Sequence, residues 1–224
     1  MKKKPVKKTK NILPEYTLGE ELVNAISHGV GAVLAISGLV FCIIHSTSAW
    51  AVVSSCIYGT MMILLYIFSC LYHALSPNTS AKKVLRILDH DNVFLMEAGT
   101  YMPICLSLLN TSGHAFAGWM TFGIVWAVTI LAIVFTSINV DKYQLVGVWC
   151  NLLLGWGSLI LLPIFIKILP VSGIFMLILG GATYSIGALW YVFGSKVKWM
   201  HSVFHFYVLL ASIFHFIFIY NYCL

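Results

Sequence analysis

The sequence predicts an all-α protein, a membrane-embedded bundle of seven transmembrane helices. Hydrophobic residues make up 60% of the 224 residues and charged residues only 9%, whereas a soluble domain carries about 25% charged residues. Apolar stretches recur along the whole chain, and each is close to the roughly 20 residues that a helix needs to cross a bilayer. They lack the alternation of polar and apolar positions that is typical of a transmembrane β-barrel. The composition therefore excludes a soluble domain.

The seven predicted spans follow one another with short connections. They lie near residues 22–44, 50–72, 92–110, 115–138, 145–166, 171–193 and 201–222. The connections leave no room for a second domain, so we expect residues 17–224 to form one membrane domain behind a basic tail of residues 1–16. The first apolar run is too long for a signal peptide and has no small-x-small cleavage site, so we expect it to be a retained anchor.

The basic residues predict how the bundle is oriented. With the N-terminus in the cytoplasm, 12 of the 13 lysines and arginines fall on the cytoplasmic side, and only Lys167 falls outside. Cytoplasmic segments are enriched in exactly these residue types. The twelve are Lys2, Lys3, Lys4, Lys7, Lys8, Lys10, Lys82, Lys83, Arg86, Lys142, Lys196 and Lys198. We therefore expect a multi-pass protein of the cell membrane with a cytoplasmic N-terminus and an external C-terminus.

The net charge of +6 does not call for a nucleic-acid partner, because much of it belongs to the first ten residues. A basic block before the first span is typical of a topology signal, or of a tail that contacts anionic lipid headgroups. The sequence therefore indicates membrane lipids as partners and no nucleic acid. It does not indicate an oligomeric state.

Polar residues gather at one membrane depth. Ionisable residues inside an apolar bundle are costly unless they are paired or bound, so their positions are informative. In the predicted topology, four spans carry such residues toward the cytoplasmic side. They are Glu20, Glu21, Asn24 and His28 in the first span, Ser69 and His73 in the second, Asp89, His90 and Asp91 at the third, and His201 and His205 in the seventh. Chance scatter does not readily produce this arrangement, so it predicts a site near the cytoplasmic face.

The histidines of this group predict a metal centre. His201 and His205 are four residues apart, so both imidazoles leave one face of a helix. Such a pair is a common way to offer two nitrogens to one metal ion, and His73 adds a third from the second span. Three histidines leave a fourth position open, as in catalytic zinc sites, whereas structural sites close their shell with four protein ligands. We therefore predict zinc bound by His73, His201 and His205.

Other polar residues are predicted to surround that metal. Ser69 lies one turn before the second-span histidine, and Asp89 follows a short loop, just before or at the start of the third span. We expect both to position the water or to orient an imidazole. Glu21, Asn24 and His28 are spaced i, i+3, i+7 and face one side of the first span. This row either supports the site or forms hydrogen bonds that hold the bundle together.

Two further polar residues lie deeper in the predicted bundle. His215 is 14 residues beyond His201, which is about 21 Å along a helix, so it cannot share that metal. We expect it to be buried and hydrogen-bonded. Glu97 lies eight residues beyond Asp89, about 12 Å deeper. A functional and a structural role both stay open for Glu97.

Six motifs resemble those of a known family. In chain order they are Glu21-x-x-Asn24-x-x-x-His28, Ser69-x-x-x-His73, Leu88-Asp89-His90, Ala98-Gly99-Thr100-Tyr101-x-Pro103, Gly180-Gly181-x-x-Tyr184-x-x-Gly187 and His201-x-x-x-His205. Together they resemble the hemolysin III family, the bacterial branch of the progestin and adiponectin receptor (PAQR) group within the CREST superfamily of seven-helix membrane proteins. The resemblance runs from about residue 17 to the C-terminus and leaves only the lysine-rich tail outside.

The resemblance implies a bacterial seven-helix protein with a cytoplasmic N-terminus and a zinc ion near the cytoplasmic face. It places the zinc on His73, His201 and His205, with Asp89 and Ser69 close to the metal-bound water. The wider superfamily includes alkaline ceramidases, and the receptor branch is linked to ceramide hydrolysis.

This sequence departs from the resemblance at two positions. Asp91 and Glu97 add acid where relatives more often carry small or apolar residues. The departure leaves the charge state of the site open.

Three functions fit the sequence. The first is a zinc-dependent hydrolase that cleaves an amide or ester bond of a lipid at the cytoplasmic side, and site chemistry alone favours it slightly. The second is a non-enzymatic regulator or sensor of membrane state, in which a structural zinc joins the second and seventh spans. The third is a hemolysin-like protein that permeabilises membranes. Against this third function, the polar residues stop at the cytoplasmic third, whereas an aqueous pore needs a polar stripe along whole helices.

Overall fold

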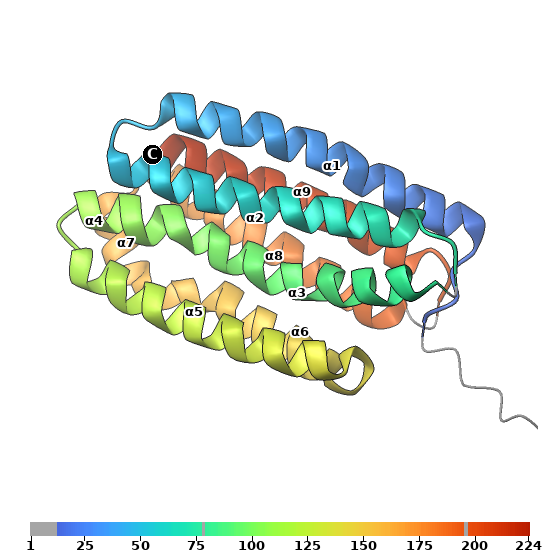
Figure 1. Cartoon of the computed structure of the whole chain (residues 1–224). Coiled ribbons are helices and arrows are strands. Elements are labelled where there is room, and N and C mark those ends of the chain that lie inside the picture. The colour runs from blue at the N-terminus through green and yellow to red at the C-terminus, as the bar shows by residue number, and fades with distance from the viewer. Residues whose placement is uncertain (1–12, 78, 195–196) are drawn as a thin grey trace, which may run out of the picture.

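The computed structural model describes residues 13–77, 79–194 and 197–224, and these residues form a bundle of long helices that run alongside one another (Figure 1). The lysines of the N-terminal tail and Lys196, which contributed to the predicted orientation, lie outside the described residues.

Seven helices of the described residues are long and apolar enough to cross a membrane. The continuous spans are α1 (Leu18–His45), α2 (Ala49–Ala74), α5 (Ala115–Ile138), α8 (Val171–Gly194) and α9 (Met200–Tyr222). The third span joins α3 (Ser80–Met102), a π-helical segment (Pro103–Leu108) and α4 (Leu109–Thr111). The fifth joins α6 (Val140–Gly157), a 3₁₀ segment (Ser158–Leu161) and α7 (Leu162–Ile168). The all-helical fold with seven candidate spans is confirmed.

The third span begins earlier than the sequence predicts. Its helix starts at Ser80 instead of near residue 92, and the hydroxyl of Thr79 caps it by accepting a hydrogen bond from the backbone N–H of Lys82 at 3.1 Å. The first three turns are rich in charged residues, so a search for apolar stretches passes over them. Asp89 consequently lies inside a helix and not in or beside a loop.

Two spans change their helical pitch where a proline interrupts the backbone hydrogen bonds. The π-helical segment begins at Pro103, and the 3₁₀ segment directly precedes the turn that contains Pro163. Proline has no N–H and its ring crowds the preceding turn, so the regular bonding pattern cannot continue through it. Both irregular segments therefore follow from the sequence.

Close helix packing rests on glycines. A Cβ atom at Gly31 would lie 2.5 Å from Cδ1 of Tyr66, so α1 and α2 can approach only because this residue has no side chain. Gly180 has the same role between α8 and α9, where a Cβ atom would collide with the ring of His215. Small residues at such contacts are typical of membrane helices.

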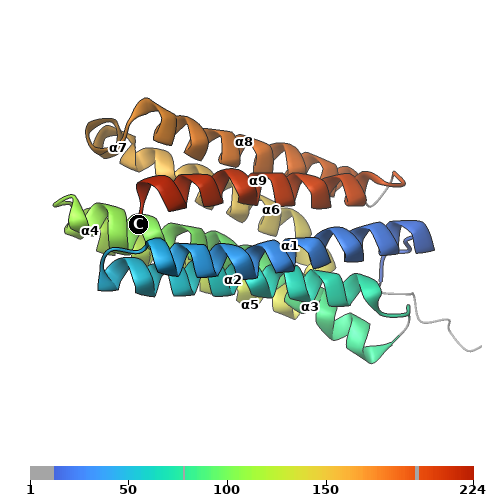
Figure 2. The same ribbon diagram turned by 90° about the horizontal axis from the view of Figure 1, so that it is seen from above.

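The helix order in space brings distant parts of the chain to one end of the bundle. The beginning of α1 and the C-terminus lie at opposite ends (Figure 1), as an odd number of spans requires. Viewed from above, α1 runs beside α2, and α8 beside α9 (Figure 2). The start of α1, the end of α2, the start of α3 and the start of α9 therefore share one end. This polar end holds the residues that the sequence predicts to form a site.

The orientation predicted from the basic residues is testable. A reporter fused after Leu224 should be external, and a reporter inserted near Lys83 should be cytoplasmic, because the twelve-to-one distribution of basic residues favours that topology. Activity of paired alkaline phosphatase and green fluorescent protein fusions measures this directly. A cytoplasmic reporter at the C-terminus would overturn the topology.

Candidate metal centre

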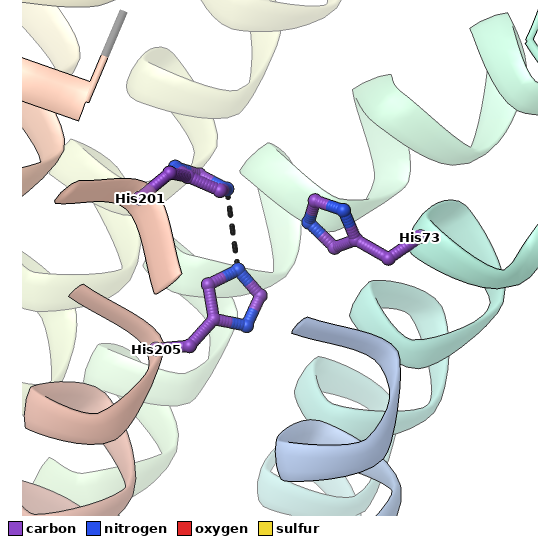
Figure 3. A group of neighbouring side chains, drawn as sticks. All are labelled: His73, His201 and His205. Atoms are coloured by element: carbon purple, nitrogen blue, oxygen red, sulfur yellow. Dashed lines mark hydrogen bonds between the residues drawn. The ribbon is translucent and has the colours of Figure 1, made fainter. Parts of the chain in front are cut away.

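Three histidines meet at the polar end of the bundle. His73 near the end of α2 faces His201 and His205 at the start of α9 (Figure 3). One ring nitrogen of each lies within 4.8 Å of one from both others. All three are buried, with 2%, 6% and 1% of their surface exposed. The Nε2 atoms of His201 and His205 are 3.2 Å apart, so the four-residue spacing does bring both rings to one point.

Glu21 on α1 orients His73. Its Oε2 lies 2.6 Å from Nδ1 of His73, and because a carboxylate only accepts, Nδ1 carries the proton. Nε2 of His73 is then left with a free lone pair, and it is buried without a hydrogen-bond partner. A carboxylate that holds the far nitrogen of a histidine fixes its tautomer and raises its basicity as a metal ligand. The amide nitrogen of Asn24 lies 3.4 Å from the same Nδ1. Both side chains thus contact the candidate ligand.

Lys82 completes this network. Only 1% of its surface is exposed, and its Nζ donates to Oε1 of Glu21 at 2.6 Å and to the carbonyl of Leu75 at 2.9 Å. Glu21 therefore lies between a lysine and a histidine, one on each oxygen. The sequence alone indicates only a topology role for Lys82. It is 61 residues from Glu21, and no helical spacing relates two residues on different helices.

Glu20, the neighbour of Glu21, holds the other side of the site. Its Oε1 accepts a hydrogen bond from the backbone N–H of Trp199 at 2.6 Å. Trp199 has a φ of 68°, a left-handed conformation that is uncommon for a residue other than glycine. It lies two residues before His201, so this bond anchors the turn that starts α9. The first turn of α1 therefore contacts both helices that carry the histidines.

Tyr16 covers the histidines from the segment before α1. Its ring stacks on that of His201, with centroids 4.9 Å apart and planes at 20°, and lies 5.7 Å from the ring of His73. Burial raises the pKa of the Tyr16 phenol above its usual range, so it stays neutral. The sequence contained no signal for this contact, because Tyr16 lies at the end of the predicted tail.

His28 lies beside the three histidines without joining them. Its ring centroid is 3.9 Å from that of His205, and its edge meets the ring of Tyr66 at 5.0 Å. Neither of its nitrogens has a hydrogen-bond partner among the described residues. The row predicted on the first span therefore does face the site along its whole length.

A cavity of about 190 Å³ opens from the histidine cluster into the bundle. His201 and His205 form part of its wall, and so do Asp89 and Ser69. The Ser69 hydroxyl is a hydrogen-bonding neighbour of the Asp89 carboxyl group. Beyond them the wall is largely apolar, with Leu65, Val93, Phe94, Ile104, Phe204 and Val208 among its residues. The site thus combines three imidazoles, a carboxyl group and a hydroxyl at the end of an apolar chamber.

The histidine cluster fits a metal ion. Buried polar atoms nearly always have a partner, yet Nε2 of His73 has none among the described residues. Ring nitrogens of His201 and His205 lie within 4.8 Å of a ring nitrogen of His73. Without a shared proton or a cation, the lone pairs of these nitrogens would repel one another. Three imidazoles suit zinc and other divalent metals that favour nitrogen ligands. The three histidines therefore form a suitable donor set for such an ion.

The remaining polar residues of the third span have other partners. Nδ1 of His90 lies 2.8 Å from the carbonyl of Arg86, and Asp91 accepts a hydrogen bond from Ser137 at 2.6 Å. His90 lines the same cavity as His201 and His205, whereas Glu97 on α3 and His215 on α9 line it farther into the bundle.

Comparison with known proteins assigns the family. The haemolysin-III related family matches residues 16–216. The chain belongs to this family. It is 35% identical to the "Hemolysin-3 homolog" of Bacillus subtilis (strain 168) over 211 residues, which cover 93% of this chain and 96% of the relative. It is also 35% identical to "Hemolysin-3" of Bacillus cereus over 196 residues, 86% of this chain and 87% of the relative.

A more distant relative comes from animals. The human "Monocyte to macrophage differentiation factor" is 22% identical over 211 residues, which cover 92% of this chain and 85% of that protein. The resemblance noted from the motifs is thus confirmed for this haemolysin-III related protein, and its relatives are consistent with the PAQR grouping.

Metal binding by the histidines is testable by mutation. His201→Ala and His205→Ala should each lower zinc occupancy and thermal stability, because the ion would join α2 to α9 and stabilises only the folded state. Metal analysis of purified protein and thermal unfolding measure both effects. His45→Ala, at an exposed histidine at the other end of α1, is the matched control and should leave zinc occupancy unchanged, although it removes a stacking contact with Tyr220. Full zinc occupancy in both ligand variants would contradict the assignment.

Lys82→Met should weaken metal binding without removing a ligand. Loss of the ammonium group leaves Glu21 with a single partner, so His73 is held less firmly. Changes in groups that support a ligand typically cost about 10- to 100-fold in metal affinity. The control is Lys83→Met at the exposed neighbouring position, where no change is expected. Equal zinc affinities of the two variants in a competition titration would show that Lys82 does not act through Glu21.

Proposed function

We propose that this haemolysin-III related protein is a metal-dependent hydrolase of a lipid amide or ester bond. One observation supports it above all others: His201 and His205 of the buried histidine cluster share the wall of a largely apolar cavity with Asp89 and Ser69. A cavity of this kind suits an acyl chain, and the polar residues at its end suit the carbonyl group of that chain. Zinc is the metal proposed for His73, His201 and His205.

The chemistry that zinc supplies when bound is Lewis acidity, which polarises a carbonyl group and makes water a stronger acid. His73, His201 and His205 would hold the ion, and Glu21 would keep His73 in the tautomer that leaves Nε2 free. Tyr16 covers the histidines from outside the bundle and so limits the access of bulk water.

Asp89 is the proposed general base. Its carboxyl group would take a proton from the attacking water and pass it to the nitrogen or oxygen of the leaving group. The products are then a fatty acid and an amine or alcohol, and no other reactant is needed. Ser69 keeps the carboxyl group of Asp89 in place by donating its single hydroxyl proton to it.

The substrate would reach the cavity from the membrane. Apolar walls favour the acyl chain, while the polar end collects the headgroup at the membrane surface. We propose entry between helices, because a lipid can then exchange the hydrocarbon of the bilayer for that of the cavity without crossing water.

A second candidate function is a regulator with a structural metal. It is supported by the way the cluster joins different helices: the histidines come from α2 and α9, and Glu21 on α1 holds one of them. A metal in this place would lock the polar end of three helices together, whether or not any lipid is cleaved.

Asp89→Asn separates the two functions. Asparagine matches the shape of aspartate but cannot take up a proton, so zinc and fold should persist while hydrolysis falls by about 10²–10⁴-fold. The measurement is fatty-acid release from a panel of membrane lipids in liposomes, by wild type, Asp89→Asn and His73→Ala. Asp91→Asn is the control, since Asp91 bonds to Ser137 and is not among the residues that line the cavity. If wild type released fatty acid no faster than His73→Ala from every lipid, the hydrolase would be ruled out and the regulator would remain.

A further inference from the structure

A carboxyl group lies in the apolar part of the cavity, away from the metal centre. Glu97 on α3 lines the cavity eight residues beyond Asp89, about 12 Å along the helix. Its Oε2 is buried and has no hydrogen-bond partner, and the ion pairs found among the described residues do not include it. A carboxyl group inside a membrane bundle is costly without a partner and marks a functional site by default.

An amide group faces the cavity from the neighbouring helix. Glu97 lies against α6 at Gly155, where a Cβ atom would be only 3.0 Å from its Oε1. Asn151 is one turn from Gly155 on the same face of α6 and lines the same cavity. Its Oδ1 is also buried without a partner. Two oxygen acceptors from adjacent helices therefore remain unpaired at this level.

A third acceptor lines the cavity from α9. Nε2 of His215 lies 3.4 Å from the carbonyl of Leu177, and because a carbonyl only accepts, this nitrogen carries the proton. Nδ1 of His215 then has a free lone pair, and it has no partner among the described residues. Three buried atoms of this part of the cavity, one each from Glu97, Asn151 and His215, therefore lack a partner.

The hydroxyl groups nearby are already engaged. Tyr101 donates to the carbonyl of Leu154, Ser158 donates to that of Gly155, and Tyr184 is hydrogen-bonded to Ser212 at 2.7 Å. The hydroxyl groups of Tyr101 and Ser158 therefore cannot serve Glu97 and Asn151 without giving up their present bonds. A ligand that pairs with Glu97 and Asn151 would bring donors of its own.

We propose that the cavity binds a hydrophobic primary amine, with its protonated amino group at Glu97 and Asn151. An ammonium group offers three donors and no acceptor, which matches these three unpartnered atoms, and its charge pairs with the carboxylate form of Glu97. A hydroxyl group would add acceptor lone pairs of its own and no charge. The alkyl chain lies along the apolar wall formed by residues such as Leu65 and Val208. This site shares its cavity with the proposed hydrolysis but uses none of the residues assigned to the reaction itself, so it does not rest on that proposal.

The test compares ligands that differ only in their polar group. Dodecylamine, dodecanol and dodecanoic acid are offered to the purified full chain in phosphatidylcholine nanodiscs, and bound ligand is counted against empty nanodiscs. Dodecylamine should bind most tightly. Glu97→Gln should weaken its binding by about 10- to 100-fold, as expected for loss of a charged hydrogen-bonding partner. The binding of dodecanol should change little.

Further variants complete the test. Asn151→Leu should also weaken amine binding, and it keeps the proposal testable if Glu97→Gln does not fold. Asp91→Asn changes a carboxyl group of the same helix that is not among the cavity residues, and should bind dodecylamine like wild type. Dodecylamine should raise the thermal stability of wild type and not that of Glu97→Gln.

Three results would overturn the proposal: equal binding of amine and alcohol by wild type, unchanged amine binding by Glu97→Gln, or amine binding that disappears when the metal is removed by a chelator. The last result would place the amine on the metal instead of on Glu97. Because the expected binding persists without metal, failure of the hydrolase and failure of the amine site are distinguishable.

Discussion

The arrangement of the polar end depends on one buried carboxylate and its two partners. Glu21 lies inside an apolar bundle, where an isolated charge is costly. It is stabilised by Lys82 on one oxygen and by His73 on the other. These contacts join α1, α2 and α3, and they determine which nitrogen of His73 faces the other histidines. Breaking one of them would leave a buried charge with too few partners, which is usually more destabilising than replacing the whole group.

The same end of α1 links this network to α9. Glu20 and Glu21 are consecutive, so on a helix they point in different directions: one holds the turn before His201, and the other holds His73. The first turn of one helix thus brings together ligands that are more than a hundred residues apart in the chain. The candidate metal centre is therefore a product of helix packing, and its geometry depends on residues that would not contact the metal.

The cavity gives the site its chemical character. At the polar end it presents imidazole, carboxyl and hydroxyl groups, while its walls farther into the bundle are largely apolar. Glu97, Asn151 and His215 interrupt the apolar part with unpaired acceptors. A cavity with polar groups at its end and again farther in suits an amphiphile. The alkyl chain would lie against the apolar wall, and the polar groups would pair with the polar side chains at the end of the cavity and with the unpaired acceptors farther in.

Much of the fold and of the site followed from the sequence because a membrane imposes strict rules. Only long apolar segments can cross it, so the spans were visible in the composition. Polar residues are rare there, so the few present pointed to a site, and His73, His201 and His205 do meet. Helical spacing predicted that His201 and His205 share a face, and it placed the Glu21, Asn24 and His28 row on one side of α1.

Contacts between residues on different helices could not be predicted from their spacing in the sequence. The early start of α3 was hidden because its first turns are charged, and their partners lie on other helices. From the sequence, Lys82 indicates only topology, whereas in the folded bundle its Nζ donates a hydrogen bond to Glu21. Tyr16 and the Glu20–Trp199 bond join segments that local periodicity does not relate. The order of residues along the chain fixes which residues are polar and how deep each lies, because depth follows from position along a span. The partner of each was decided only when the helices packed, because contacts between helices depend on their rotation and order in space.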